Sequence, residues 1–156
     1  MARMSKHLLV VWHTKTGNTG ALIDAALRGA GEVEADVELR ALRAQDAGPQ
    51  DLLWAEALLL ATPENFGYMS GAMKDFFDRT FYEVEGKLNP LPFALIVCAG
   101  NDGTGAVRAI TRIAPGYPFV ACAEPLIVRG EPTDADLVAC HELGMTLSAG
   151  LDMGIF

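Results

Sequence analysis

The chain has 156 residues, of which 51% are hydrophobic and 21% charged. This length fits one compact domain whose core is large enough to be stable without a disulfide or a bound metal. Twelve basic residues against 20 acidic residues give a net charge of −8. Such a balance argues against nucleic acid or an anionic membrane as the main partner.

The cysteines and the apolar runs indicate where the chain is expected to work. Three widely spaced cysteines form neither a C-x-x-C pair nor a zinc-type spacing, so we expect a reduced, metal-free protein. The apolar run 7–12 is too short for a signal-peptide core, and no run reaches the about 18 apolar residues of a membrane-spanning helix. We therefore expect a single domain over residues 1–156, located in the cytoplasm and not inserted in a membrane.

The first half of the chain alternates apolar runs with helical patterns. Residues 8–12 predict a strand buried on both faces of a parallel sheet. A helix is predicted over 21–27, with Gly29 and Gly31 ending its apolar spacing. Residues 33–42 alternate as a more peripheral strand does, and 51–54 fit a short turn of helix. The run 57–61 predicts another buried strand, closed by Thr62 and Pro63 because proline cannot continue a central ladder.

The second half repeats this alternation. Ser70 is expected to open a helix, residues 93–98 to form the fourth strand, and 107–114 to form a helix that Pro115 stops. The last strand is predicted within 119–128, interrupted at Pro125. Thr133 or Asp134 is expected to cap a final helix that runs through Leu147. Strands and helices that alternate at this spacing predict an α/β domain with a parallel sheet.

Three loops follow the carboxyl ends of the predicted central strands, at residues 13–19, 62–69 and 99–105. In open parallel α/β sheets, ligands bind at this edge beside a topological switch point. We therefore expect the three loops to converge on one site.

The first loop combines hydroxyl and amide side chains with the start of a helix, in the sequence Thr14-Lys-Thr-Gly-Asn-Thr19. Free backbone N–H groups and the positive end of the helix dipole suit a phosphate. The same Thr and Asn residues would serve equally well as simple helix caps, so both interpretations stay open. The loop contains neither a P-loop nor G-x-G-x-x-G, which disfavours ATP and a Rossmann-bound dinucleotide.

Two motifs together resemble a known family. The first loop resembles the T-x-T-G-N-T phosphate loop of flavodoxin-like proteins, which hold the 5′-phosphate of FMN mainly with neutral donors. Residues 62–79, TPENFGYMSGAMKDFFDR, are similar to the T-P-x-x-x-G-x-x-S-G-x-M-K-x-F-x-D-R segment of flavodoxin-like NAD(P)H-dependent flavin and quinone reductases. The resemblance implies a three-layer flavodoxin-like fold with a five-stranded parallel sheet in the order 2-1-3-4-5.

The resemblance also implies a cofactor site. The isoalloxazine ring of FMN would lie against residues 63–67, with Phe66 as a flat apolar surface, whereas the alternative places Phe66 in the core and Gly67 in an ordinary turn. Asn101 or Asp102 would bond the pyrimidine side of the ring. The expected cofactor-binding residues are Thr14, Lys15, Thr16, Gly17, Asn18 and Thr19 in the first loop, Thr62, Pro63, Glu64, Asn65, Phe66 and Gly67 in the second, and Ala99, Gly100, Asn101, Asp102, Gly103 and Gly105 in the third.

The implied function is that of an FMN oxidoreductase. It would accept hydride from NAD(P)H and reduce a quinone, a flavin or a similar acceptor, with the flavin carrying the chemistry, so no catalytic acid or base is named. The alternative is a flavodoxin that carries electrons to a redox protein without oxidising NAD(P)H itself. A flavin-free binding or regulatory module is a third interpretation. A homodimer or tetramer is compatible with the reductase.

Other residues have ordinary structural interpretations that we favour. Ser70 is expected to cap a helix rather than act as a nucleophile, and Cys98 to be a small core residue. The aromatic group formed by Phe76, Phe77, Phe81 and Tyr82 is expected to be mostly core. Four aromatic residues exceed what one inner face needs, so part of this group is a candidate for a subunit interface.

Overall fold

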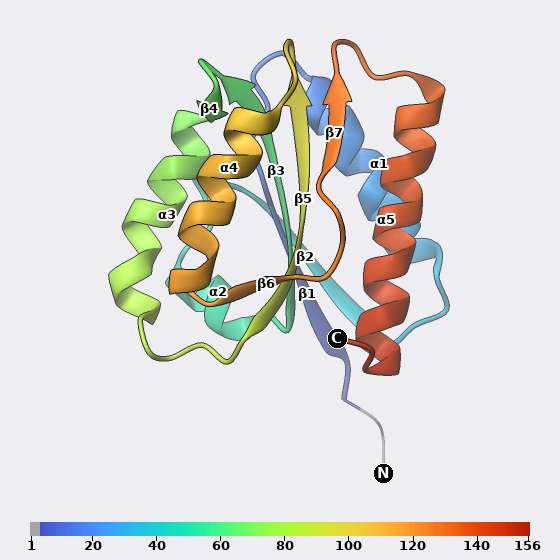
Figure 1. Ribbon diagram of the computed structural model, residues 1–156. Coiled ribbons are helices and arrows are strands. Elements are labelled where there is room, and N and C mark those ends of the chain that lie inside the picture. Colours follow the sequence, from blue (N-terminus) through green and yellow to red (C-terminus); the bar gives the residue numbers. More distant parts are fainter. Residues whose placement is uncertain (1–3) are drawn as a thin grey trace.

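The computed structural model describes residues 4–156 and has three layers, with a parallel sheet between two layers of helices (Figure 1). The strands of the sheet are β1 (Lys6–Trp12), β2 (Val37–Arg43), β3 (Ala57–Asn65), β5 (Leu91–Ala99), β6 (Phe119–Ala121) and β7 (Leu126–Arg129). Their order is β2-β1-β3-β5, and β6 and β7 both pair with β5, so that two short strands share the fifth position. This confirms the predicted 2-1-3-4-5 arrangement and the interruption near Pro125.

The helices divide between the two faces of the sheet (Figure 1). On one face lie α1 (Asn18–Glu32) and α5 (Asp134–Met153), and on the other lie α2 (Pro49–Trp54), α3 (Gly71–Val84) and α4 (Thr104–Ile113). Each face has its own apolar core, because the fully buried strand residues alternate between the two layers. No helix in residues 4–156 is both long and apolar enough to cross a membrane.

Helix α1 shows where the predicted boundaries were wrong. It continues through Gly29 and Gly31 to Glu32 instead of ending at these glycines. Position 29 requires a glycine because α5 passes too close to α1 for a side chain. A Cβ at this position would lie 1.9 Å from the carbonyl oxygen of His141. The second predicted strand was also too long at its start, because β2 begins only at Val37.

Strand β3 corrects the expectation that Pro63 closes a strand. The strand continues to Asn65, and Pro63 lies opposite Cys98 of β5 in the parallel register. Pairing with β1 has already ended at Ala61. Proline is tolerated here because β1 no longer pairs with this part of β3.

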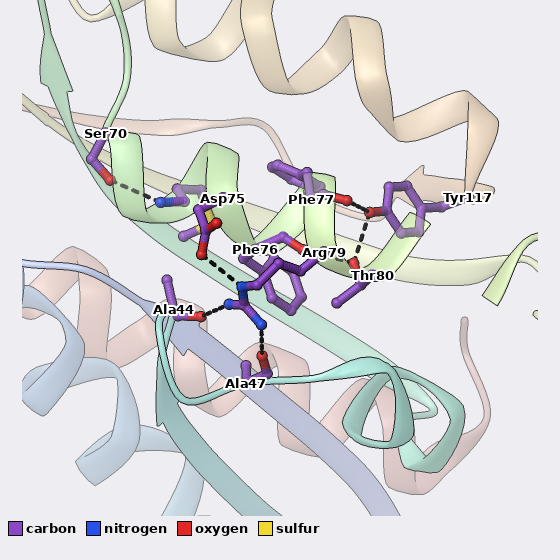
Figure 2. Close-up of polar contacts among 10 residues, drawn as sticks. Ala44, Ala47, Ser70, Asp75, Phe76, Phe77, Arg79, Thr80 and Tyr117 are labelled. Atoms are coloured by element: carbon purple, nitrogen blue, oxygen red, sulfur yellow. Dashed lines mark hydrogen bonds and ion pairs between the residues drawn. The ribbon is translucent and has the colours of Figure 1, made fainter. Parts of the chain in front are cut away.

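The aromatic group on α3 is divided by burial. Phe76 and Phe77 are fully buried, Phe81 packs at the edge of the same core, and Tyr82 is exposed. The core expectation is therefore confirmed for Phe76 and Phe77. The Tyr117 hydroxyl contacts this helix, donating to the carbonyl oxygen of Phe77 at 2.9 Å and lying 2.9 Å from the Thr80 hydroxyl oxygen (Figure 2).

Burial raises the pKa of Tyr117 from 10.0 to about 12, which makes folding stability sensitive to alkaline pH. Folded Tyr117 keeps a proton that the unfolded chain releases above pH 10, so its contribution is complete below pH 10 and is lost as the pH rises towards 12. We expect Tyr117 to account for a loss of about 1.4 kcal/mol in unfolding free energy between pH 8 and pH 11. Urea unfolding at both pH values measures this loss.

Tyr117→Phe should remove that pH-dependent component, while lowering stability at pH 8 by about 1 kcal/mol through its lost hydrogen bonds. Tyr82→Phe is the matched control, because it deletes the hydroxyl of a side chain that is 82% exposed. An unchanged alkaline slope in Tyr117→Phe would contradict the assignment.

Candidate functional site

The first loop joins β1 to α1 and leaves the start of the helix without a side-chain cap. Gly17 is the N-cap residue, with a φ of 99°, and no side chain bonds the free N–H groups of the first turn. The Thr14 hydroxyl instead accepts a hydrogen bond from the Gly17 N–H at 3.0 Å and so organises the loop before the helix. The helix-cap interpretation of the Thr and Asn residues is therefore wrong, and the positive end of α1 is open to an anion.

The second loop is a tight hairpin between β3 and the two-residue strand β4 (Tyr68–Met69). Its turn residues Phe66 and Gly67 have φ values of 53° and 69°, the left-handed pair that a two-residue type I′ turn needs. The Phe66 side chain is fully exposed, so the alternative that placed it in the core is wrong.

Two predicted residues next to this hairpin have structural roles. Thr62 is fully buried, and its hydroxyl accepts from the Ser70 N–H at 3.0 Å and donates to the Pro63 carbonyl oxygen at 2.8 Å. Ser70 in turn caps α3, because its hydroxyl oxygen accepts from the Met73 N–H at 3.2 Å. The expectation that Ser70 is a helix cap is confirmed.

The third loop runs from β5 into α4. Gly103 is the N-cap residue with a φ of 76°, and the Asp102 carboxylate accepts from both the N–H and the hydroxyl of Thr104, at 3.0 and 2.8 Å. These bonds lower the pKa of Asp102. Gly105 faces the hairpin, where a Cβ would lie 1.9 Å from the Gly67 carbonyl oxygen. Asp102 and Gly105 thus hold the start of α4 in place.

A cleft of about 220 Å³ lies where the three loops meet at the carboxyl edge of the sheet. Its lining residues are Lys15, Thr16, Asn18, Thr19, Pro63, Glu64, Asn65, Cys98, Ala99, Gly100 and Gly130. The structure therefore brings together residues from all three predicted loops. The predicted residues that do not line the cleft are Thr14, Gly17, Thr62, Phe66, Gly67, Asn101, Asp102, Gly103 and Gly105.

Two lining residues were not among the predicted site residues. Cys98, expected in the core, is buried but also borders the cleft, and its Sγ lies 3.8 Å from the Gly130 carbonyl oxygen. Burial raises the pKa of this thiol, an effect that its hydrogen bond with Thr19 partly offsets.

Gly130 follows β7, and its N–H bonds the Ala99 carbonyl oxygen at 2.8 Å. The rule that predicted the other loops also applies after the last strand, and it would have found Gly130.

The cleft is nearly neutral in spite of the acidic chain. Lys15 is its one basic lining residue and Glu64 its one acidic lining residue. Behind the first loop, burial and the neighbouring Lys15 charge lower the pKa of His13, whose Nδ1 is buried without a hydrogen-bond partner. No group of three or more metal-ligating side chains occurs within residues 4–156. The arrangement suits an anion held by neutral donors beside a flat hairpin.

A larger hollow of about 510 Å³ has different chemistry. It is lined by Pro90, Pro92, Val120, Ala121, Cys122, Ile155 and Phe156. Its lining side chains are apolar except for the Cys122 thiol, so it offers few of the side-chain polar groups that fix the orientation of a ligand. The cleft at the carboxyl edge is the stronger candidate.

Comparison with known proteins gives two kinds of match in sequence. The family model described as NADPH-dependent FMN reductase matches residues 49–118. A flavodoxin of Aquifex aeolicus (strain VF5) is 27% identical over 157 residues, which covers 90% of this chain and 84% of that protein.

Solved structures match over nearly the whole chain. A flavodoxin from the domain Archaea has a TM-score of 0.80 at 22% identity and covers 93% of this chain and 98% of its own. Oxidised flavodoxin 1 from Bacillus cereus has a TM-score of 0.77 at 19% identity and covers 89% of this chain and 95% of its own. With the strand order and the helix layers described above, these matches show that the chain has the flavodoxin-like fold.

Proposed function

We propose that the protein binds FMN in the cleft at the carboxyl edge of the sheet. The observation that carries the proposal is the convergence of the uncapped α1 N-terminus, the polar side chains of Thr16, Asn18 and Thr19, and the β3–β4 hairpin on one cleft. The α1 N-terminus and the side chains of Thr16, Asn18 and Thr19 would hold the phosphate. Residues 63–67 with Ala99 and Gly100 would lie against the ring.

The donor set and the size of the cleft fit this cofactor. A phosphate at the end of a helix needs backbone N–H groups and hydroxyl donors rather than a cluster of cations, and Lys15 is the one basic residue present. The volume of about 220 Å³ lies below the roughly 300 Å³ at which small-molecule pockets usually begin. Part of the cofactor would therefore stay exposed, next to the exposed Phe66.

FMN would supply electron transfer, and the chain would position it and set its electrostatic surroundings. The α1 N-terminus and Thr19 would bind the phosphate, and the hairpin would orient the ring. Glu64, the one acidic lining residue, would keep the hairpin in place through its bond to the Ala106 N–H of α4.

We further propose that the protein is an electron carrier that works with other redox proteins. The Aquifex aeolicus relative is a flavodoxin, and it aligns with 90% of this chain. The net charge of −8 favours docking of basic protein partners, whereas the single Lys15 offers little to the phosphates of a nicotinamide dinucleotide.

The rival function is an NADPH-dependent reductase, favoured by the family model over residues 49–118. The segment 62–79, which carries the reductase resemblance, is mostly structural in this fold. Arg79 donates to the carbonyl oxygens of Ala44 and Ala47 and bonds Asp75, so that α3 is fastened to the loop before α2 (Figure 2). With Thr62 and Ser70 in hydrogen bonds and Phe76 in the core, similarity in this segment supports the fold more than hydride transfer.

Anaerobic reduction of the FMN-loaded protein separates the two functions. We expect the flavin absorption to persist when excess NADH or NADPH is added, and to disappear when a separate flavodoxin reductase is included. Light scattering should report a monomer. Direct bleaching by either nucleotide, with turnover of a quinone, would instead establish the reductase, and failure to bind FMN would contradict the proposed cofactor.

A further inference from the structure

The N-terminus of α4 is capped by a residue from a distant part of the chain. Its own N-cap residue, Gly103, has no side chain, and the Asp102 carboxylate bonds the N–H and hydroxyl of Thr104, the first residue of the helix. The N–H of Ala106 instead donates to Oε2 of Glu64 at 3.1 Å, across 42 residues of sequence. A carboxylate at this position also interacts favourably with the positive end of the ten-residue helix.

The hairpin that carries Glu64 is seated on the same helix turn. Gly67 contacts α4 so closely that position 105 accommodates only glycine, since a Cβ would lie 1.9 Å from the Gly67 carbonyl oxygen. The turn also contains Phe66 at a φ of 53°, a conformation that costs a bulky residue of order 1 kcal/mol. The exposed Phe66 side chain gives little packing in return, so the neighbouring contacts must hold the turn.

The Glu64–Ala106 hydrogen bond and the close contact between Gly67 and Gly105 form a clamp that holds the hairpin on α4. Glu64 connects this clamp to the cleft. It borders the cleft beside Pro63 and Asn65, while its carboxylate is engaged with α4. We propose that Glu64 is a positioning residue, which fixes the β3–β4 hairpin on α4 and thereby sets the wall against which a flavin ring lies. The inference rests on the proposed function, and it assigns the carboxylate to the Ala106 N–H rather than to the cofactor.

The test compares Glu64→Ala with Glu64→Gln in the full chain, using FMN and riboflavin as probes. Glutamine keeps an oxygen acceptor for the Ala106 N–H, whereas alanine removes it. We expect Glu64→Ala to lower the affinity for FMN and for riboflavin by the same factor, about ten-fold. The affinities of Glu64→Gln should stay within about three-fold of those of the parent. Flavin fluorescence on binding measures both affinities. Thermal unfolding checks that each variant is folded.

Asp136→Ala is the matched control. The Asp136 carboxylate also caps a helix at this edge of the sheet, accepting from the Thr133 N–H at 2.9 Å, but it belongs to α5 and has no bond to the hairpin. We expect this variant to bind both probes like the parent. An equal loss in Asp136→Ala would show general loosening and overturn the proposal.

Three further results would overturn it. Unchanged affinities in Glu64→Ala would show that the clamp does not position the ring. A loss of affinity restricted to FMN would place Glu64 at the phosphate. An equal loss of affinity in Glu64→Gln would mean that the charge matters rather than the hydrogen bond. If the parent binds neither probe, the proposed function fails. In that case, amide hydrogen exchange at Ala106 tests the clamp by itself. Faster exchange in Glu64→Ala only would support the clamp, and equal exchange rates in the parent, Glu64→Ala and Glu64→Gln would overturn it.

Discussion

Replacing Thr19 by valine is expected to weaken FMN binding about ten- to a hundred-fold. Thr19 is in the first turn of α1, is only 2% exposed and borders the cleft. Valine preserves the shape of the side chain but removes the hydroxyl that would donate to a charged phosphate oxygen. A hydrogen bond of that kind contributes about 1.5–3 kcal/mol, and calorimetric titration with FMN measures the loss.

Riboflavin, which lacks the phosphate, supplies the internal control. Its affinity should be about the same for the parent and for Thr19→Val, because riboflavin has no phosphate for the Thr19 hydroxyl to contact. Thr16→Ala, which removes the other loop hydroxyl that borders the cleft, is expected to show the same selectivity for FMN. If both variants bind FMN as the parent does, the first loop is not the phosphate site.

The parts of the fold that could be predicted are those encoded in short runs. Strands buried on both faces read as continuous apolar segments. The register between β1 and β3 begins with Leu8 and Ala57, which are the first residues of the two predicted runs. The rule that ligands bind at the carboxyl edge then placed the three loops together, and the cleft confirms that convergence.

The parts that could not be predicted depend on contacts between distant segments. Glu64 reads as one of several polar loop residues, and only the folded chain places its carboxylate 3.1 Å from the Ala106 N–H. Gly105 reads as part of a flexible glycine cluster, yet the close approach of Gly67 is what excludes a side chain there. Neither role leaves a local pattern, because each is set by the packing of the hairpin on α4.

Pro63 and Gly29 illustrate a second limit, since the same residue type has opposite meanings in different surroundings. Proline ends a strand in the middle of a sheet but is tolerated in β3 beyond Ala61, where β1 no longer pairs. Glycine ends many helices, but in α1 it permits contact with α5. Tertiary packing decides between these meanings.

The contact between α1 and α5 gives Gly29→Ala a large expected effect on stability. A Cβ at Gly29 would lie 1.9 Å from the backbone oxygen of His141, and the reciprocal position Gly144 faces the Ala26 oxygen at the same distance. Backbone atoms cannot move aside as the end of a flexible side chain can, so α1 and α5 must separate. We expect this separation to cost about 3 kcal/mol of unfolding free energy, the upper end of the usual range for overpacking substitutions. Better helix propensity offsets about 1 kcal/mol of this cost, which leaves a net loss of about 2 kcal/mol.

Gly31→Ala in the same helix is the matched control for this prediction. A Cβ there meets nothing within 4 Å and the residue is exposed, so only the propensity gain acts. We expect Gly31→Ala to raise the free energy of unfolding by about 0.5–1 kcal/mol, which separates the two variants by nearly 3 kcal/mol in urea unfolding. Equal stabilities would mean that α1 and α5 are farther apart than the backbone contact at Gly29 requires, and that Gly29 ends the helix as its sequence pattern suggests.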